Sequence, residues 1–357
     1  MGIDYTKYPL SALVSPVDHR DFITTAAIPR DIQLPSKFSF KDKIKTILNQ
    51  ETYGICVGCA AADMKNVQEV ADNNLPTNGF SPVYLYTLAK QIDGIPNIWG
   101  TYPRAAMQVL SEKGTLPYDD MPVSVLDSSG GKLPTITQDQ INKAMPQKIS
   151  SYAQVPLDIM ALKQAMVSTQ SPVMISVSVT DSFYYPEQNK YIAKPNSHYY
   201  GGHEIVVIGY DDDMTYTYAN GETHKGFIEI QNSWTANWAN GGFAYIPYDA
   251  LGWYLPAPYP YVGACFIVEL WSSIDDHSDM PQPVKPRYWR IQTGAFSIKT
   301  NAQNYQVQLK QKGLSTYLVF VDNLWKVQLG AYLIEQNSRN YSATLKTQGI
   351  NNFVVYY

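Results

Sequence analysis

The sequence has few cysteines, few charges and no long apolar run. Only 3 of its 357 residues are cysteine, and 16% are charged. Three cysteines cannot form a disulfide framework, and at least one thiol stays free. No stretch approaches the roughly 18 apolar residues of a membrane-spanning helix, and the N-terminus has no apolar signal-peptide core. We therefore expect synthesis in the cytoplasm without a signal peptide, no membrane partner, and one cysteine kept for chemistry.

The charges divide the chain into two parts of opposite sign. The net charge is −4, but from Lys285 to Tyr357 nine Lys and Arg stand against Asp322 and Glu335. That gives 9 − 2 = +7 for the tail and −4 − 7 = −11 for the rest. Such asymmetry indicates two modules with different partners. The polar, proline-rich stretch 272–287 is typical of a linker, so we place the domain boundary there.

The basic tail contains an internal repeat. The segment RIQTGAF at 290–296 recurs as KVQLGAY at 326–332, and Gly313 is matched by Gly349. Each half has an alternating strand, a helix stopped by glycine, and an apolar strand. Two such units predict a small ferredoxin-like β-α-β-β-α-β domain over residues 288–357.

The preceding part, residues 34–271, changes from helical to strand-like patterns. Alanine-rich spacing predicts a buried helix from Cys56 to about Asp72. Apolar and β-branched runs predict strands at 172–179, 205–210 and 226–231. A helical half followed by a strand half indicates the α+β class. Residues 1–33 carry little periodicity and are predicted to form an extended N-terminal arm.

Cys56 and Cys59 open the predicted helix. A helix N-terminus stabilises thiolate through its dipole and free N–H groups, which lowers the thiol pKa. A nearby imidazolium would lower it further and produce a nucleophile. Alternatively, the two are small core residues, a redox pair, or half of a zinc site. Zinc is disfavoured because no second Cys-x-x-Cys or His-x-His cluster completes a ligand set, and we expect no metal or cofactor.

Taken alone, a histidine such as His203 at a strand end is more often a surface residue, but His203 and Asn232 have the chemistry that a nucleophilic cysteine needs in its partners. His203 stands at the mouth of the strand 205–210, where a histidine can face a cleft as a general base. Asn232 follows the strand 226–231, and its side-chain oxygen can accept from one imidazole N–H so that the other nitrogen faces the thiol. Trp234 would shield that hydrogen bond from water. The other histidines are His198, which competes from a loop, and His19, His224 and His277 in polar surroundings.

These segments resemble the papain family of cysteine peptidases. The family has glutamine six residues and glycine two residues before its nucleophile; Gln50 and Gly54 stand so before Cys56, and Cys59 has neither. His203 precedes an apolar strand ending in Gly-Tyr, as in the family. The family's Asn-Ser-Trp-x3-Trp-x3-Gly-aromatic motif recurs from Asn232 to Phe243. The resemblance covers the chain from about Leu34 to Leu270.

The resemblance implies a two-lobe fold with a helical lobe and a β-rich lobe, and it implies roles for individual residues. Cys56 would be the nucleophile, His203 the general acid/base and Asn232 its orienting residue. Gln50 and the Cys56 backbone N–H would form the oxyanion hole. The substrate-binding residues would be Gly100, Thr101, Tyr102, Gly202 and Trp234.

The sequence also departs from the family pattern. Glu51 follows Gln50, Val57 follows Cys56 and Glu204 follows His203, where the family commonly has other residues. Thr101 replaces the second glycine of a Gly-Gly-x-Pro substrate strand. Residues 1–33, shorter than the usual pro-segment, are predicted to be a short inhibitory arm of a zymogen.

The tail from Tyr288 to Tyr357 resembles the SPOR domain, which binds peptidoglycan glycan strands. Its positive charge and aromatic residues suit sugar stacking and an anionic cell wall. An RNA-recognition module has the same element order, but its aromatic-rich RNP1 string is absent, so we expect no nucleic-acid partner. A purely structural or dimerising domain is a further alternative.

Together these features predict a bacterial or phage-encoded cysteine endopeptidase directed to peptidoglycan by its C-terminal domain. Its substrate would be a protein or peptide, and it would act at the cell wall after lysis or release. The alternatives are a catalytically silent wall-binding protein, and a transpeptidase or isopeptidase that uses the same acyl-enzyme on stem peptides.

Overall fold

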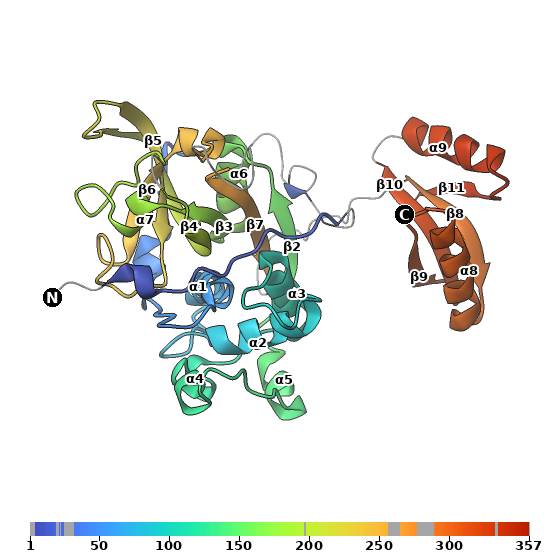
Figure 1. Ribbon diagram of the computed structural model, residues 1–357, viewed down its shortest axis with the longest axis horizontal. Helices are drawn as coiled ribbons and strands as arrows, with labels where there is room; N and C mark the ends of the chain where they lie inside the picture. Colours follow the sequence, from blue (N-terminus) through green and yellow to red (C-terminus); the bar gives the residue numbers. More distant parts are fainter. Residues whose placement is uncertain are drawn as a thin grey trace. The chain divides into compact units, whose positions relative to one another are not determined.

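A computed structural model describes residues 4–18, 21, 23–24, 32–195, 198–255, 265–276, 289–332 and 335–356. The chain divides into a larger unit, Met1–Pro16 with Phe22–Val284, and a smaller one that contains Lys285–Tyr357 (Figure 1). Among the described residues, no helix is both long and apolar enough to cross a membrane.

The helices of the larger unit begin at well-defined capping residues. Ser81 accepts a hydrogen bond from the Tyr84 N–H at the start of α2, and Asp158 caps α6 in the same way. Gly58 lets α1 approach α2 closely, because a Cβ there would lie 2.3 Å from the Pro82 carbonyl oxygen. The helices are α1 (Cys56–Ala71), α2 (Pro82–Ile92), α3 (Pro103–Lys113), α4 (Ser124–Ser128), α5 (Gln138–Ala144), α6 (Ile159–Thr169) and α7 (Asp181–Tyr184).

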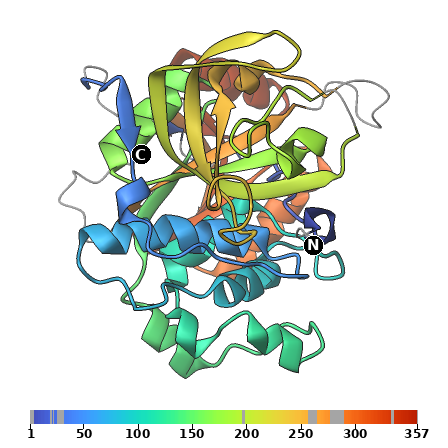
Figure 2. The ribbon, with the colours of Figure 1, turned by 90° about the vertical axis from the view of Figure 1, so that its left-hand side faces the viewer.

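The strands of the larger unit form one antiparallel sheet in the order β2-β7-β3-β4-β5-β6, with β1 paired to β4. In Figure 2 the blue-to-green helices α1 to α5 lie below the yellow-green strands β4 to β6. The strands are β1 (Lys37–Ser39), β2 (Ile149–Val155), β3 (Val173–Val179), β4 (Gly201–Thr217), β5 (Thr223–Gln231), β6 (Phe243–Pro247) and β7 (Ile267–Asp275). Short 3-10 turns are Tyr5–Lys7, Lys41–Lys43, Tyr118–Asp120 and Tyr248–Gly252.

The linker predicted to start at Ser272 begins later, and this prediction is corrected. Strand β7 continues to Asp275, which pairs with Ile149 of β2. Ser272 and Ser273 are buried in this sheet, so their polarity concealed a strand. The rest of the predicted linker, residues 277–287, lies outside the described residues.

Helix α1 packs against both the other helices and the sheet, and most of its residues are buried. Its Lys65 is fully buried and forms ion pairs with Glu69 of the same helix, at 2.5 Å, and with Asp275 of β7. The ion pair with β7 joins the helical half to the strand half, and α1 therefore fixes where Cys56 meets the sheet.

The smaller unit has the predicted β-α-β-β-α-β order, and the α+β class is confirmed for the chain. Its antiparallel sheet runs β11-β8-β10-β9. Repeat-related Ile291 and Val327 are both buried in its core, with Leu309 and Leu345 from the helices. The elements are β8 (Trp289–Phe296), α8 (Lys299–Gln311), β9 (Tyr317–Val321), β10 (Leu324–Tyr332), α9 (Glu335–Thr347) and β11 (Phe353–Tyr356).

Candidate active site

Cys56 is the first residue of α1, and its side chain is fully buried. Its Sγ lies 3.3 Å from the Ser11 hydroxyl oxygen. The backbone amides of Ser11 and Glu204 also hydrogen-bond the thiol. Since Glu204 follows His203 on β4, the helix brings Cys56 against the part of the sheet that carries the predicted base.

His203 and Asn232 come from neighbouring strands and form a hydrogen bond. The imidazole Nε2 lies 2.8 Å from Oδ1 of Asn232, which follows the last residue of β5. The amide oxygen can only accept, so Nε2 carries the proton and Nδ1 keeps a lone pair. Nδ1 is buried and has no hydrogen-bond partner among the described residues. The Trp234 ring stacks on the imidazole at a centroid distance of 4.8 Å and shields the bond from water.

Gln50 is held with its amide nitrogen toward the main chain of the arm. Its Oε1 accepts from the Trp234 indole N–H at 3.2 Å and from the Ser233 hydroxyl at 3.1 Å. Its Nε2 donates to the Pro9 carbonyl oxygen at 2.8 Å. The Pro9 carbonyl of the arm therefore accepts from the amide group that the resemblance to the papain family assigns to the oxyanion hole.

Residues of the N-terminal arm pair with both walls of this site. The Ala12 N–H donates to the Gly202 carbonyl at 3.0 Å, on the sheet side. The Thr101 N–H donates to the Ser11 carbonyl at 3.2 Å, and the Leu13 N–H donates to the Thr101 carbonyl at 3.1 Å. In Figure 1 the dark-blue arm runs between α1 and the strands. The arm therefore pairs through its main chain with Gly202 and Thr101, two of the predicted substrate-binding residues.

The ends of the arm are anchored by other side chains of the site. The rings of Tyr5 and Tyr8 lie against Trp234 at centroid distances of 6.3 and 5.4 Å. Further along, the Ser15 N–H donates to the Glu269 carboxylate at 2.9 Å. The arm thus passes from Trp234 over Cys56 to Thr101, and it pairs with Thr101 in a parallel sense.

Burial shifts the pKa values of both Cys56 and His203, the predicted nucleophile and base. It raises the pKa of Cys56 above its usual value, against the opposing hydrogen bonds from Ser11 and the backbone. It lowers the pKa of His203 to about 4, against the opposing hydrogen bond to Asn232. With the arm in place, both pKa shifts favour the uncharged forms, a thiol and a neutral imidazole.

The predicted substrate-binding residues have different surroundings. Thr101 and Gly202 bind the arm, and Trp234 covers His203. Gly100 leaves room for the arm, because a Cβ there would lie 2.5 Å from the Ser11 carbonyl oxygen. Tyr102 instead precedes α3 and packs on the core of the larger unit. Their roles in binding substrate stay predictions.

The other candidates for nucleophile and base, Cys59, His198 and His224, are buried in the helix or in contact with other side chains. Cys59 is fully buried one turn into α1, and burial raises its pKa well above the usual value, as expected for an unreactive thiol. The His198 ring packs edge-on against Tyr200, and His224 Nδ1 lies 2.9 Å from Asp249. His19 and His277 lie outside the described residues.

Two features of the site have no signal in the sequence. Pro9 and Ser11 belong to an arm without periodicity, so nothing in the local pattern placed them at Gln50 and Cys56. Glu204 is fully buried beside the site, where burial raises its pKa well above the usual value and Ser176 donates to it. In the sequence, Glu204 was recognisable only as a departure from the family pattern, and its burial beside the site could not be predicted.

Among the described residues, the one group of carboxylates close enough to share a metal ion is Glu69, Asp275 and Asp276. The Lys65 amine lies among them, within 3.7 Å of an oxygen of Asp276 and closer to the other two. A buried ammonium group there already supplies the balancing positive charge.

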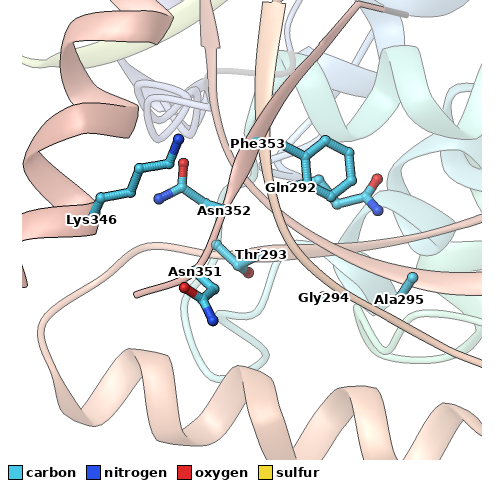
Figure 3. Close-up of a pocket in the computed structure, with 8 residues that line it drawn as sticks. All are labelled: Gln292, Thr293, Gly294, Ala295, Lys346, Asn351, Asn352 and Phe353. Atoms are coloured by element: carbon cyan, nitrogen blue, oxygen red, sulfur yellow. The ribbon is translucent and has the colours of Figure 1, made fainter. Parts of the chain in front are cut away.

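The smaller unit has a shallow cavity of about 450 Å³ at the edge formed by β8, α9 and β11 (Figure 3). Lys346 of α9 extends toward Asn352, and Phe353 stands on the other side with 55% of its surface exposed. An exposed aromatic ring beside amide and amine groups is a suitable lining for a sugar. The lining residues are Gln292, Thr293, Gly294, Ala295, Lys346, Asn351, Asn352 and Phe353.

Comparison with known proteins agrees with this geometry. Residues 34–252 match the family model "Papain family cysteine protease", and residues 285–356 match "SPOR domain". The structure is similar to xylellain, a cysteine protease from Xylella fastidiosa, with a TM-score of 0.61 and 21% identity over 75% of this chain and 97% of that one. Procathepsin B S9 from Trypanosoma congolense has a TM-score of 0.51 and 13% identity over 77% of this chain and 88% of that one. At these identities both likenesses show the fold alone. Comparison with curated proteins gives no match.

Proposed function

Because this chain belongs to the papain family of cysteine proteases, we propose that it is an endopeptidase in which Cys56, His203 and Asn232 perform the chemistry. The observation that carries the proposal is the hydrogen bond between Nε2 of His203 and Asn232 beneath Trp234. It leaves Nδ1 of the imidazole unpaired among the described residues and available to the thiol.

Once a peptide replaces the arm, the proton of Cys56 moves to Nδ1 of His203 and the thiolate attacks the peptide carbonyl carbon. Gln50 Nε2 and the Cys56 backbone N–H hold the resulting oxyanion. The imidazolium gives its proton to the leaving amine as the C–N bond breaks, and a thioester remains. Water then gives a proton to Nδ1 and attacks the thioester. The C–S bond breaks, and the thiol regains its proton from the imidazolium.

We also propose that residues 4–16 act as an inhibitory segment. They satisfy Gln50, Gly202 and Thr101 with main-chain groups, so a substrate cannot reach these donors and acceptors. They also exclude water from the Cys56–His203 pair, which keeps it neutral and unreactive.

Comparing hydrolysis of a fluorogenic peptide library by the full chain and by a chain shortened to 34–357 tests both proposals. We expect little hydrolysis by the full chain, strong hydrolysis by the shortened chain, and none by the shortened chain with Cys56→Ala. Equal rates from both chains would overturn the inhibitory role. A folded shortened chain that hydrolyses nothing would overturn the peptidase, and a shortened chain that joins peptides would indicate a transpeptidase.

For the smaller unit we propose binding to peptidoglycan glycan strands, which would direct the peptidase to the cell wall after lysis or release. The match to the SPOR domain and the aromatic and polar cavity around Phe353 support this role. Sedimentation with purified sacculi, before and after an amidase removes stem peptides, is the test. We expect more binding after amidase treatment, and a large loss with Phe353→Ala while the exposed control Val307→Ala binds normally. Absence of binding to either form would contradict the proposal.

A further inference from the structure

The strand that pairs with the arm, residues 100–101, is held from behind by a charged network on α2 and its C-terminal loop. The Lys90 amine lies 2.7 Å from the Asp93 carboxylate and donates to the carbonyl oxygens of Ile95, Ile98 and Gly100 at 2.9, 2.8 and 2.9 Å. The Lys90 side chain is 8% exposed and that of Asp93 is fully buried. One ammonium group therefore binds three carbonyl oxygens of the loop between α2 and Thr101.

Thr101 connects this network to the cleft. Its hydroxyl donates at 2.9 Å to the same Asp93 oxygen that pairs with the Lys90 amine, and its backbone N–H and carbonyl pair with Ser11 and Leu13 of the arm. Thr101 is fully buried, with its hydroxyl on Asp93 and its main-chain groups on the arm. The hydrogen bond to Asp93 gives a threonine side chain a partner at a position where the family pattern has glycine.

No disulfide bond holds this loop, because residues 90–101 contain no cysteine. A second contact to α2 comes from Tyr86, whose hydroxyl oxygen accepts from the Gly100 N–H at 2.9 Å. The N–H and the carbonyl of Gly100 thus both bind α2 side chains. The N–H and the carbonyl of the next residue, Thr101, bind the arm. The position of residues 100–101 therefore depends on the side chains of Tyr86, Lys90 and Asp93.

We infer that Lys90, Asp93 and Thr101 are positioning residues that hold the 100–101 strand in the geometry needed to bind the main chain of any peptide in the cleft. In the full chain the bound peptide is the arm itself. After the arm leaves, the same segment would bind a peptide substrate, and this second role rests on the proposed function. Loss of the Thr101 hydroxyl frees the strand from Asp93 and weakens both of its hydrogen bonds to the bound chain.

The test uses the full-length protein and the rate at which iodoacetamide alkylates Cys56, followed by mass spectrometry of the cysteine peptides. The thiol reacts only when the arm leaves, so the rate reports how firmly the arm is held. We expect Thr101→Val to raise the Cys56 rate about threefold to tenfold, the effect of weakening one or two hydrogen bonds. Thr101→Ser keeps the hydroxyl and should restore the wild-type rate.

Two controls separate positioning from general destabilisation. Thr115 is also fully buried, but its hydroxyl has no partner among the described residues, so Thr115→Val should leave the Cys56 rate unchanged. Cys59 lies inside the core and reacts only when the unit unfolds, and its rate should stay constant in every variant. An unchanged Cys56 rate in Thr101→Val, or a parallel rise at Cys59, overturns the inference. Because alkylation needs no turnover, failure to hydrolyse peptides would refute the proposed function without affecting this result.

Discussion

The Ser11 hydroxyl oxygen lies 3.3 Å from Sγ of Cys56, so the arm touches the proposed nucleophile itself. Two residues earlier, the Pro9 carbonyl accepts from the Gln50 side-chain amide. One residue later, the Ala12 N–H donates to the Gly202 carbonyl. Because three successive parts of the machinery are covered by one short segment, release of the arm is the step that exposes the site.

Loosening the aromatic end of the arm should expose Cys56. Tyr8→Ala removes a ring that packs against Trp234, a contact worth about 0.5–1.5 kcal/mol beyond the area it buries. We expect Cys56 alkylation in the full chain to become about tenfold faster, since the buried ring area is lost as well. Tyr356→Ala, half exposed in the smaller unit, is the control and should change nothing. An unchanged rate in Tyr8→Ala would show that this ring contact does not hold the arm.

The two cysteines of α1 should respond differently to substitution. Cys56→Ala in the shortened chain should reduce peptide hydrolysis by about 10⁴-fold or more, because the nucleophile is lost. Cys59→Ala should keep activity within a few-fold and lower the melting temperature slightly, since it removes a small buried side chain. Steady-state kinetics with matched melting curves measures both. Equal losses of activity in two folded variants would contradict the assignment of Cys56.

Gln50 should contribute to the transition state and little to substrate binding. In the shortened chain, Gln50→Ala should lower kcat by about 10²–10³-fold with a small change in KM, as expected for one oxyanion donor. Gln138→Ala, an exposed glutamine on α5, is the control. If KM rises while kcat stays constant, Gln50 binds the ground state and the oxyanion role is wrong.

His203 should make the stability of the full chain sensitive to acid. Its pKa falls from 6.5 when exposed to about 4 in the fold, so the unfolded chain takes up a proton first as the pH drops. The contribution of neutral His203 to the free energy of unfolding is complete above pH 6.5. It is lost progressively as the pH falls to the folded pKa of about 4. By 1.36 kcal/mol per pKa unit it amounts to about 3 kcal/mol.

Urea unfolding at pH 7 and pH 4 measures this effect as a difference between wild type and His203→Gln, which carries no titrating group at this position. The difference removes the contributions of other groups, including the buried Glu204 and Glu269, whose raised pKa values act in the opposite direction. We expect wild type to lose about 3 kcal/mol more than the variant. Parallel losses in both proteins would mean that His203 titrates normally.

Much of the fold followed from local patterns. The repeat predicted the smaller unit, because each half buries the same apolar positions, such as Ile291 and Val327. The helix at Cys56 and the strands around His203 and Asn232 were predicted from small and β-branched runs. The strand end at Asp275 was missed, because Ser272 and Ser273 are buried through main-chain pairing that polarity does not reveal.

The residues of the candidate site could be predicted from the sequence, but the position of the N-terminal arm against them could not. Spacing before Cys56 and after Asn232 identified the groups, since the motifs are local in sequence. The position of Ser11 beside Cys56, 45 residues away, depends on tertiary packing of a segment with no periodicity. For the same reason the side-chain link from Thr101 to Asp93 could not be anticipated, although it explains why threonine is accepted there.

The central claim is that Cys56 is the nucleophile of a peptidase that the N-terminal arm holds silent. Labelling with an epoxysuccinyl peptide inhibitor at neutral pH, followed by mass spectrometry, tests it most directly. We expect one equivalent of adduct on Cys56 in the chain shortened to 34–357, with complete loss of peptide hydrolysis. We expect slow labelling of the full chain and none at Cys59. A folded shortened chain without an adduct at Cys56, or full hydrolysis after labelling of Cys56, would contradict it.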